Sequence, residues 1–184
     1  MTTDNSADGP EIELTNPDEY ISEQCSNAVV NGMEFSVPCT YEDLTDLFVL
    51  KPVGEKVSFK DEGFYVQAYN MFTEDDQYIG MADIVNFNDG SSVTSALESI
   101  YVLNYTEGQS SLAVGGIEAG RTTRSEIEAR PGEGYDPLAD RGLDGGDIGY
   151  TYAEYTFEDG TLSVVYSKDT VVNCRAWFDP LKNL

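Results

Sequence analysis

A two-residue alternation of side-chain types recurs along this chain and limits its fold more than any other feature. Apolar or aromatic side chains alternate with others over Gly63–Phe72, Thr161–Ser167 and Thr170–Phe178. Successive side chains of a β-strand point to opposite faces of a sheet, so this period predicts antiparallel strands with one packed face and one open face. Further strands are expected over Met33–Val37, Lys56–Lys60, Tyr78–Phe87, Ile100–Tyr105, Leu112–Ile117 and Gly149–Phe157.

The segment Val29–Glu34 predicts a tight hairpin ahead of these strands. Its centre is Asn31-Gly32, and both residue types tolerate the positive φ angles that a type I′ turn requires. A two-residue turn at this point pairs Val30 with Met33.

Two short helices are expected, each opened by a threonine that an acid follows three residues later. Thr40–Asp43 opens a helix that runs to about Val49, and Thr123–Glu126 opens one that runs to about Ala129. In this pattern the threonine caps a backbone N–H and the acid favours the positive end of the helix. Each helix follows a strand and precedes a run of strands, so the chain is predicted to contain two copies of one unit. A helical turn is expected between them at Ser95–Glu98.

The predicted fold class is α+β, with two repeats of short helix plus antiparallel strands and with the helices packed on one face of the sheet. An acidic disordered tether is expected over residues 1–24. The first α+β repeat is expected over 25–106 and the second over 107–184, and the two repeats form one joint domain.

Three segments together resemble a known repeat: Asn31–Thr40, Gly116–Ile127 and Phe157–Leu162. The resemblance covers roughly residues 28–178 and is to the β-lactamase-inhibitor-protein-like and SmpA/OmlA-like repeat domains of secreted lipoproteins of unknown function from Gram-positive gut bacteria. The loop Arg130–Gly134 departs from the Gly-x-Pro of that repeat. The resemblance implies a secreted protein and supplies no catalytic residues.

Charge and composition exclude several classes of function. The chain has 34 Asp and Glu against 10 Lys and Arg, no histidine, and a formal net charge of −24. Phosphate binding depends on Lys and Arg, so nucleic acid is not expected as a partner and neither is an anionic membrane surface. The absence of histidine excludes Ser-His-Asp and Cys-His catalysis and disfavours zinc and iron sites.

The first twenty residues are polar and acidic and contain two prolines, Pro10 and Pro17. Such a segment is typical of a solvated tether. Two origins are open: the spacer of a lipoprotein whose lipid anchor has been removed, which is favoured, or a native cytoplasmic N-terminus. The favoured origin predicts an extracellular protein anchored to the cell envelope.

Three cysteines leave two alternatives open. In the register of the predicted hairpin, Cys25 lies opposite Pro38, one residue short of Cys39. A bulge at Pro38 would bring the two thiols together as a disulfide, whereas the other alternative is three buried thiols without a disulfide. Cys174 is expected to be a small core residue.

Carboxylates are the plentiful reactive groups, and their scatter favours a solvated acidic surface over an active site. A carboxylate-based hydrolase of extracellular glycan is one alternative, and an acidic DNA-mimic decoy is another. No cofactor is expected. A calcium ion is a less favoured possibility, held by the acids of one Gly-rich loop: Asp136, Asp140, Asp144 and Asp147.

The favoured function is a non-catalytic extracellular binding domain for a protein or glycan at the cell surface. Strand parity predicts which side chains form the open, partner-binding face of the sheet. They are rich in Tyr, Trp, Met and Arg, which are enriched at binding hot spots. The predicted face consists of Tyr65, Gln67, Tyr69 and Met71 from the first unit, and Tyr150, Tyr152, Arg175 and Trp177 from the second.

Overall fold

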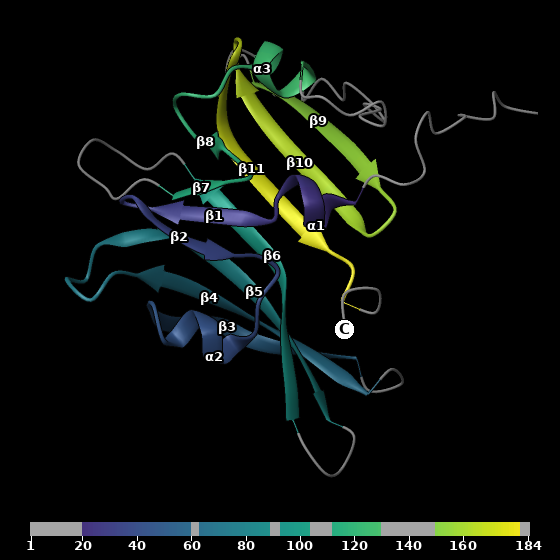
Figure 1. The fold of residues 1–184 in the computed structure, drawn as a ribbon. Coiled ribbons are helices and arrows are strands. Elements are labelled where there is room, and N and C mark those ends of the chain that lie inside the picture. Colours follow the sequence, from purple (N-terminus) through teal and green to yellow (C-terminus); the bar gives the residue numbers. More distant parts are fainter. Residues whose placement is uncertain (1–19, 60–62, 89–92, 104–111, 130–149, 181–184) are drawn as a thin grey trace, which may run out of the picture.

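The computed structural model describes residues 20–59, 63–88, 93–103, 112–129 and 150–180 (Figure 1). In these ranges the chain is mostly β, with two antiparallel sheets and three helices of four or five residues. The helices are α1 (Ile21–Gln24), α2 (Tyr41–Thr45) and α3 (Arg124–Glu128). The strands are β1 (Asn27–Val30), β2 (Met33–Ser36), β3 (Val49–Phe59), β4 (Phe64–Phe72), β5 (Tyr78–Asn88), β6 (Val93–Leu103), β7 (Leu112–Val114), β8 (Ile117–Glu118), β9 (Tyr150–Phe157), β10 (Gly160–Ser167) and β11 (Thr170–Phe178).

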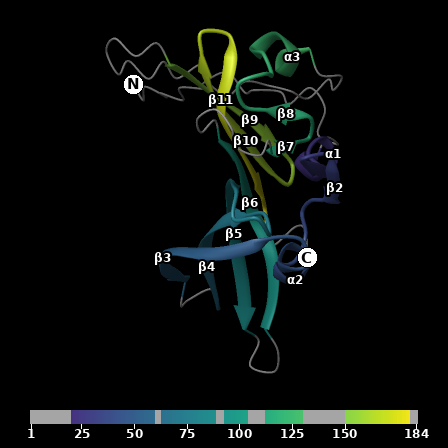
Figure 2. The ribbon, with the colours of Figure 1, turned by 90° about the vertical axis from the view of Figure 1, so that its left-hand side faces the viewer.

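The large sheet has seven strands in the order β3-β4-β5-β6-β11-β10-β9, and the small sheet has four in the order β2-β1-β7-β8. Two runs of consecutive strands, β3–β6 and β9–β11, therefore meet where β6 pairs with β11. Viewed from the side, the small sheet and the three helices lie on the same side of the long strands β5 and β6 (Figure 2). We call this covered side of the large sheet the inner face and the opposite side the outer face.

The predicted α+β class, with helices packed on one face of the sheet, is wrong. Each of α2 and α3 spans five residues and buries one side chain, Leu44 in α2 and Ile127 in α3. So short a helix cannot cover a seven-stranded sheet. Buried side chains of the small sheet, such as Ala28 and Val114, join the hydrophobic core with those of the large sheet. The two sheets therefore share one hydrophobic core, to which α2 and α3 each add one fully buried side chain.

The two predicted helix starts are confirmed. Thr40 accepts a hydrogen bond from the amide of Asp43 at 3.2 Å, and the Asp43 carboxylate accepts one from the Thr40 amide at 2.9 Å. Thr123 and Glu126 form the same reciprocal capping box at 3.3 and 2.8 Å. Helix α2 ends at Thr45 instead of Val49, and Val49 is the first residue of β3.

The predicted hairpin is also confirmed. Val30 pairs with Met33, and the turn residues have φ angles of 51° for Asn31 and 83° for Gly32. These positive φ values are those of a type I′ turn.

Of the two alternatives for the cysteines, the structure shows the one without a disulfide. Cys25 and Cys174 are buried as expected, whereas Cys39 is half-buried. The carbonyl of Ser26 accepts a hydrogen bond from Val37, which continues the hairpin register past its last paired strand residues. The core position expected for Cys174 is confirmed, since it is 1% exposed.

Several strand and helix boundaries differ from the predictions. β3 starts at Val49 instead of Lys56, because Pro52 and Gly54 break the alternation without ending the strand. The helical turn expected at Ser95–Glu98 is wrong, since these residues belong to β6. The predicted tether to residue 24 includes α1, whose Ile21 is fully buried.

The Asp159 carboxylate fixes α1 to the large sheet. It accepts hydrogen bonds from the Ile21 amide at 2.5 Å and from the amide and hydroxyl of Ser22 at 3.3 and 2.5 Å. Asp159 lies in the turn between β9 and β10 and is only 2% exposed. A charged acceptor at the start of a helix satisfies N–H groups that have no partner within the helix.

Candidate functional site

The outer face is continuous from β9 to β5. Directly opposed residues of antiparallel strands share a face, and one such row runs Glu154, Ser163, Arg175, Tyr101 and Met81. All five side chains are half-exposed. In the neighbouring row, Ile100 and Ala176 oppose each other and are fully buried on the inner face.

The structure places all four predicted residues of the second unit on the outer face. Arg175 stands in the row described above, and Trp177 follows two residues later on β11. Tyr152 and Tyr150 precede Glu154 on β9 by two and four residues, so they share its face. Tyr150 is 43% exposed and the other three are half-exposed. These four residues therefore form the side of the outer face nearest the β9 edge.

The four predicted residues of the first unit lie on the inner face, so the predicted single patch is wrong. Tyr69 opposes the buried Ala82 and Gln67 opposes the buried Ile84. Met71 is fully buried in the core, and the Tyr69 ring packs against Tyr41 of α2 at 5.5 Å between centroids. Tyr65 shares this face by alternation along β4.

The parity of β4 was misread because both of its faces carry large side chains. The side chains of β4 that face outward, which include Phe64 and Phe72, are as a group more apolar than those that face inward. The rings of Phe59, Phe64 and Phe87 form a row across β3, β4 and β5. The ring centroids are 4.9 Å apart for Phe59 and Phe64 and 5.6 Å apart for Phe64 and Phe87. The ammonium of Lys51 lies 4.0 Å from the centre of the Phe72 ring. Neighbouring strands thus shield these outward rings, and α2 decides which face is packed.

One polar cluster on the outer face joins β5, β6 and β11. The Tyr101 hydroxyl donates to the Asp83 carboxylate at 2.7 Å, and the Arg175 guanidinium lies 3.7 Å from the same carboxylate. The guanidinium also lies over the Tyr101 ring, 5.3 Å from its centre. These contacts hold an aromatic ring and a guanidinium in fixed positions at the surface, because each contact restricts the rotamers of both side chains.

A second polar cluster joins β9 and β10. The Tyr152 hydroxyl donates to the Glu154 carboxylate at 2.6 Å and lies 3.1 Å from the Ser163 hydroxyl, which is itself 3.3 Å from Glu154. The ring of Tyr152 is therefore held against the sheet by its own hydroxyl.

The two carboxylates of these clusters do not form a hydrolytic pair. Asp83 on β5 and Glu154 on β9 are separated by four strand spacings, which is about 19 Å at ~4.8 Å per spacing. Paired glycosidase carboxylates stand roughly 5–10 Å apart. The arrangement of these two acids therefore does not match a glycosidase.

Two further chemical features of the described residues are their possible metal ligands and the half-buried thiol of Cys39. Among these described residues, no three His, Cys, Asp or Glu side chains are grouped so that they could hold a metal ion. The possible calcium ligands Asp136 to Asp147 lie outside the described residues. Burial, and then the charge of Asp43, raises the pKa of Cys39 to about 12, so this thiol is protonated at neutral pH.

The prediction missed Asp83, Tyr101, Ser163 and Glu154, which complete the two clusters. Tyr101 lies on a strand that was expected, and Glu154 has the same parity as Tyr152. Alternation alone would have identified Glu154. Asp83 and Tyr101 needed the knowledge that β6 pairs with β11, which is not a local property of the sequence.

Comparison with known proteins gives no relative: no family model, no curated protein and no solved structure matches this chain. The resemblance to β-lactamase-inhibitor-protein-like and SmpA/OmlA-like repeats therefore stays a prediction. Within the described ranges, no helix is long and apolar enough to cross a membrane.

Proposed function

We propose that this protein is a non-catalytic binding domain that contacts a partner protein through the outer face of its large sheet. The observation that carries the proposal is the set of half-exposed Tyr, Trp and Arg side chains on one face of β6, β11 and β9, with β10 between the last two. The contact surface consists of Tyr101, Tyr152, Arg175 and Trp177, with Tyr150 at its margin.

The chemistry of these side chains supports a binding role. Trp, Tyr and Arg dominate binding hot spots because they offer a large contact area together with a polar tip. Tyr101, Tyr152 and Arg175 are each held by a neighbouring carboxylate. Side chains that are already ordered lose little conformational entropy on binding, so more of the contact energy contributes to affinity.

A protein partner is favoured over a glycan. The hydroxyls of Tyr101 and Tyr152 already donate to Asp83 and Glu154, so their protons are engaged within the surface. Tyr, Trp and Arg are enriched at protein interfaces, whereas a sugar is held by hydrogen bonds to its hydroxyls as well as by ring contacts.

The proposed setting is the extracellular side of a cell envelope, with the acidic N-terminal segment as the spacer from a lipid anchor. The polar, acidic composition of the first twenty residues, which is typical of a solvated spacer, supports this setting. Cell fractionation with an antibody against the domain tests it: the protein is expected in the envelope fraction, and recovery in the cytoplasm would contradict the proposed setting.

The binding proposal is tested by capture from native envelope extract with four baits: the unaltered chain, Trp177→Ala, Tyr152→Ala and the control Val57→Ala. Val57 lies on β3 in the other half of the large sheet and is 57% exposed. A protein held by the unaltered and Val57→Ala baits should be reduced at least tenfold on the other two baits, while their melting temperatures stay within a few degrees.

Equal capture by all four baits would contradict the proposal, as would unfolding of both the Trp177 and Tyr152 variants. Binding of purified envelope glycan that is lost in the same two variants, without a protein partner, would replace the protein with a glycan ligand.

A further inference from the structure

We propose a second binding site, separate from the outer face: the open edge of β2 adds an extended, basic peptide segment of a partner as a further strand of the small sheet. The peptide lies in the groove between β2 and α2. Figure 1 shows β2 with β1 on one side and α2 on the other.

The edge of β2 offers backbone hydrogen-bonding groups. β2 is the terminal strand of the small sheet, and among the residues that the structure describes it pairs with β1 alone. The two-residue turn makes Val30–Met33 a hydrogen-bonded pair, and such pairs alternate along an antiparallel ladder. The N–H and C=O groups of Glu34 and Ser36 therefore point away from β1, toward the groove. Both residues are exposed.

The groove beside this edge has room for side chains. One cavity of about 510 Å³ is lined by Met33, Leu47 and Phe48 together with residues of the turn between β4 and β5. A second cavity of about 270 Å³ is lined by Phe35, Cys39 and again Leu47. Because both cavities share Leu47, they form neighbouring compartments along β2. Side chains two residues apart on an added strand would be spaced by roughly 7 Å, which suits two such compartments.

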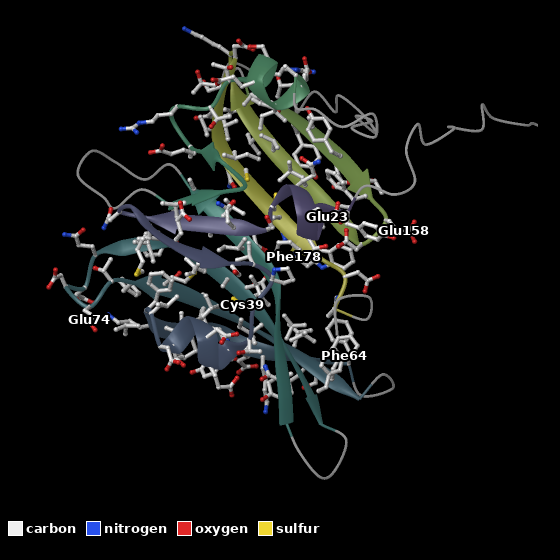
Figure 3. All side chains as sticks on the ribbon, in the orientation of Figure 1. Glu23, Cys39, Phe64, Glu74, Glu158 and Phe178 are labelled. Carbon is white, nitrogen blue, oxygen red and sulfur yellow. The ribbon has the colours of Figure 1, made fainter. Side chains whose placement is uncertain are left out.

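The rim of the groove is acidic. Asp43, Asp46, Glu74 and Asp75 line the two cavities, and among the described lining residues there is no Lys or Arg. Figure 3 shows Glu74 at the turn after β4 and Cys39 between the small sheet and α2. Hydrogen bonds from the Thr40 amide and hydroxyl lower the pKa of Asp43, so this carboxylate stays ionised at neutral pH. Lys51 is the neighbouring cation, and it pairs with Asp76 at 2.6 Å.

Charge selects the occupant. A second copy of this chain carries a formal charge of −24, and the chain's own residues 1–19 contain acids and no Lys or Arg. Both would be repelled by the rim. A partner segment in which Lys or Arg alternates with apolar residues fits, because the apolar side chains fill the compartments. The long basic side chains cover Leu47 with their methylene stems and reach the carboxylates with their charged ends.

The other exposed edge at this end of the molecule is protected against strand addition. β3 contains Pro52, a register break between Val53 and Val57, and the charged Lys51 and Lys56. Proline, bulges and lysines are three of the features that block edge pairing; short strands and other charged residues are further ones, and β2 has four residues and the acid Glu34. β2, with the sequence Met-Glu-Phe-Ser, has none of the three.

The test is a titration of the ¹⁵N-labelled full chain with acetyl-(Lys-Val)₃-amide. The expected result is saturable binding with the largest amide shifts at Glu34 and Ser36. Binding should weaken at least tenfold in the triple variant Asp46→Asn, Glu74→Gln, Asp75→Asn, and it should be unchanged in Trp177→Ala, which keeps this test separate from that of the outer face.

A matched peptide, N-methylated at alternate residues so that it cannot donate to the edge, is expected to bind at least tenfold more weakly. Equal binding of the two peptides would overturn strand addition and leave only charge attraction. No saturable binding, or largest shifts away from β2, would overturn the site.

Discussion

The two ends of the large sheet bury their strands in different ways. β10 alternates strictly, with Leu162, Val164 and Tyr166 buried and the residues between them half-exposed. β4, the corresponding inner strand of the other end, has one buried residue, Met71, and eight half-exposed ones. A strand with one fully covered face thus stands in the same sheet as a strand with two half-covered faces.

The difference comes from what lies on each strand. The β9–β11 end is packed on its inner face by residues such as Ile21 of α1, which Asp159 holds in place. At the β3–β5 end, aromatic rings cover part of the outer face and α2 covers part of the inner face. We therefore expect stability to be concentrated in the β9–β11 end, since burial of apolar area is the main stabilising term.

The largest expected difference in lost stability between the two ends comes from truncating one phenylalanine at each end. Phe178 on β11 is fully buried, so Phe178→Ala should lower the free energy of unfolding by about 3–5 kcal/mol. Phe59 on β3 is 41% exposed, so Phe59→Ala should cost less than about 1 kcal/mol. Urea unfolding followed by circular dichroism measures both. Similar losses for the two variants would remove the distinction between the ends.

A smaller difference in lost stability is expected when one turn carboxylate is removed at each end. Asp159→Ala leaves the amides of Ile21 and Ser22 without their acceptor and should cost about 2–3 kcal/mol. Asp75→Ala, in the exposed turn between β4 and β5, should change the free energy of unfolding by less than about 0.5 kcal/mol. The same urea titration compares them, and a neutral Asp159→Ala would show that α1 does not depend on this carboxylate.

The smallest difference between the two ends is expected for the helix caps, whose losses should be equal. Thr40→Ala and Thr123→Ala each remove the cap of a short helix and should cost about 1 kcal/mol. Unequal losses, or a loss near zero in either variant, would show that the two capping boxes are not equivalent.

These capping boxes also predict a pH dependence. Hydrogen bonds from the threonine amides and hydroxyls lower the pKa of Asp43 and of Glu126 from their ordinary values of 3.8 and 4.5. Their contribution is therefore present above about pH 5 and is lost as the pH falls through the lowered values. The threonine variants should consequently differ less from the unaltered chain at pH 2.5 than at pH 7. An equal difference at both pH values would contradict a role for the ionised acids.

Local patterns predicted the elements that depend on neighbouring residues. The Asn31-Gly32 hairpin, the two threonine caps and the strands around β10 and β11 all follow from signals within a few residues. β3 was predicted too short because Pro52 and Gly54 interrupt the pattern, although an edge strand tolerates both.

The fold class and half of the candidate site depend on contacts that are distant in the sequence. Nothing local shows that β1 pairs with β7 to form a second sheet, which replaces the expected helices as the cover of the inner face. The cover of the inner face, which consists of the small sheet together with α2, fixes Met71 inside and leaves Arg175 outside. For β4, whose two faces both carry large side chains, alternation shows that two faces exist but not which one is packed.

The measurement that tests the opposite placement of the two faces most directly is solvent paramagnetic relaxation of the methionine methyl groups. Met71 on β4 is fully buried on the inner face, whereas Met81 on β5 opposes Tyr101 on the outer face and is half-exposed. With a neutral gadolinium chelate, the Met81 methyl should relax strongly, close to that of the 41% exposed Met33, and the Met71 methyl should stay nearly unaffected. Strong relaxation of Met71 together with protection of Met81 would show that the packed and open faces of the sheet are the reverse of those described.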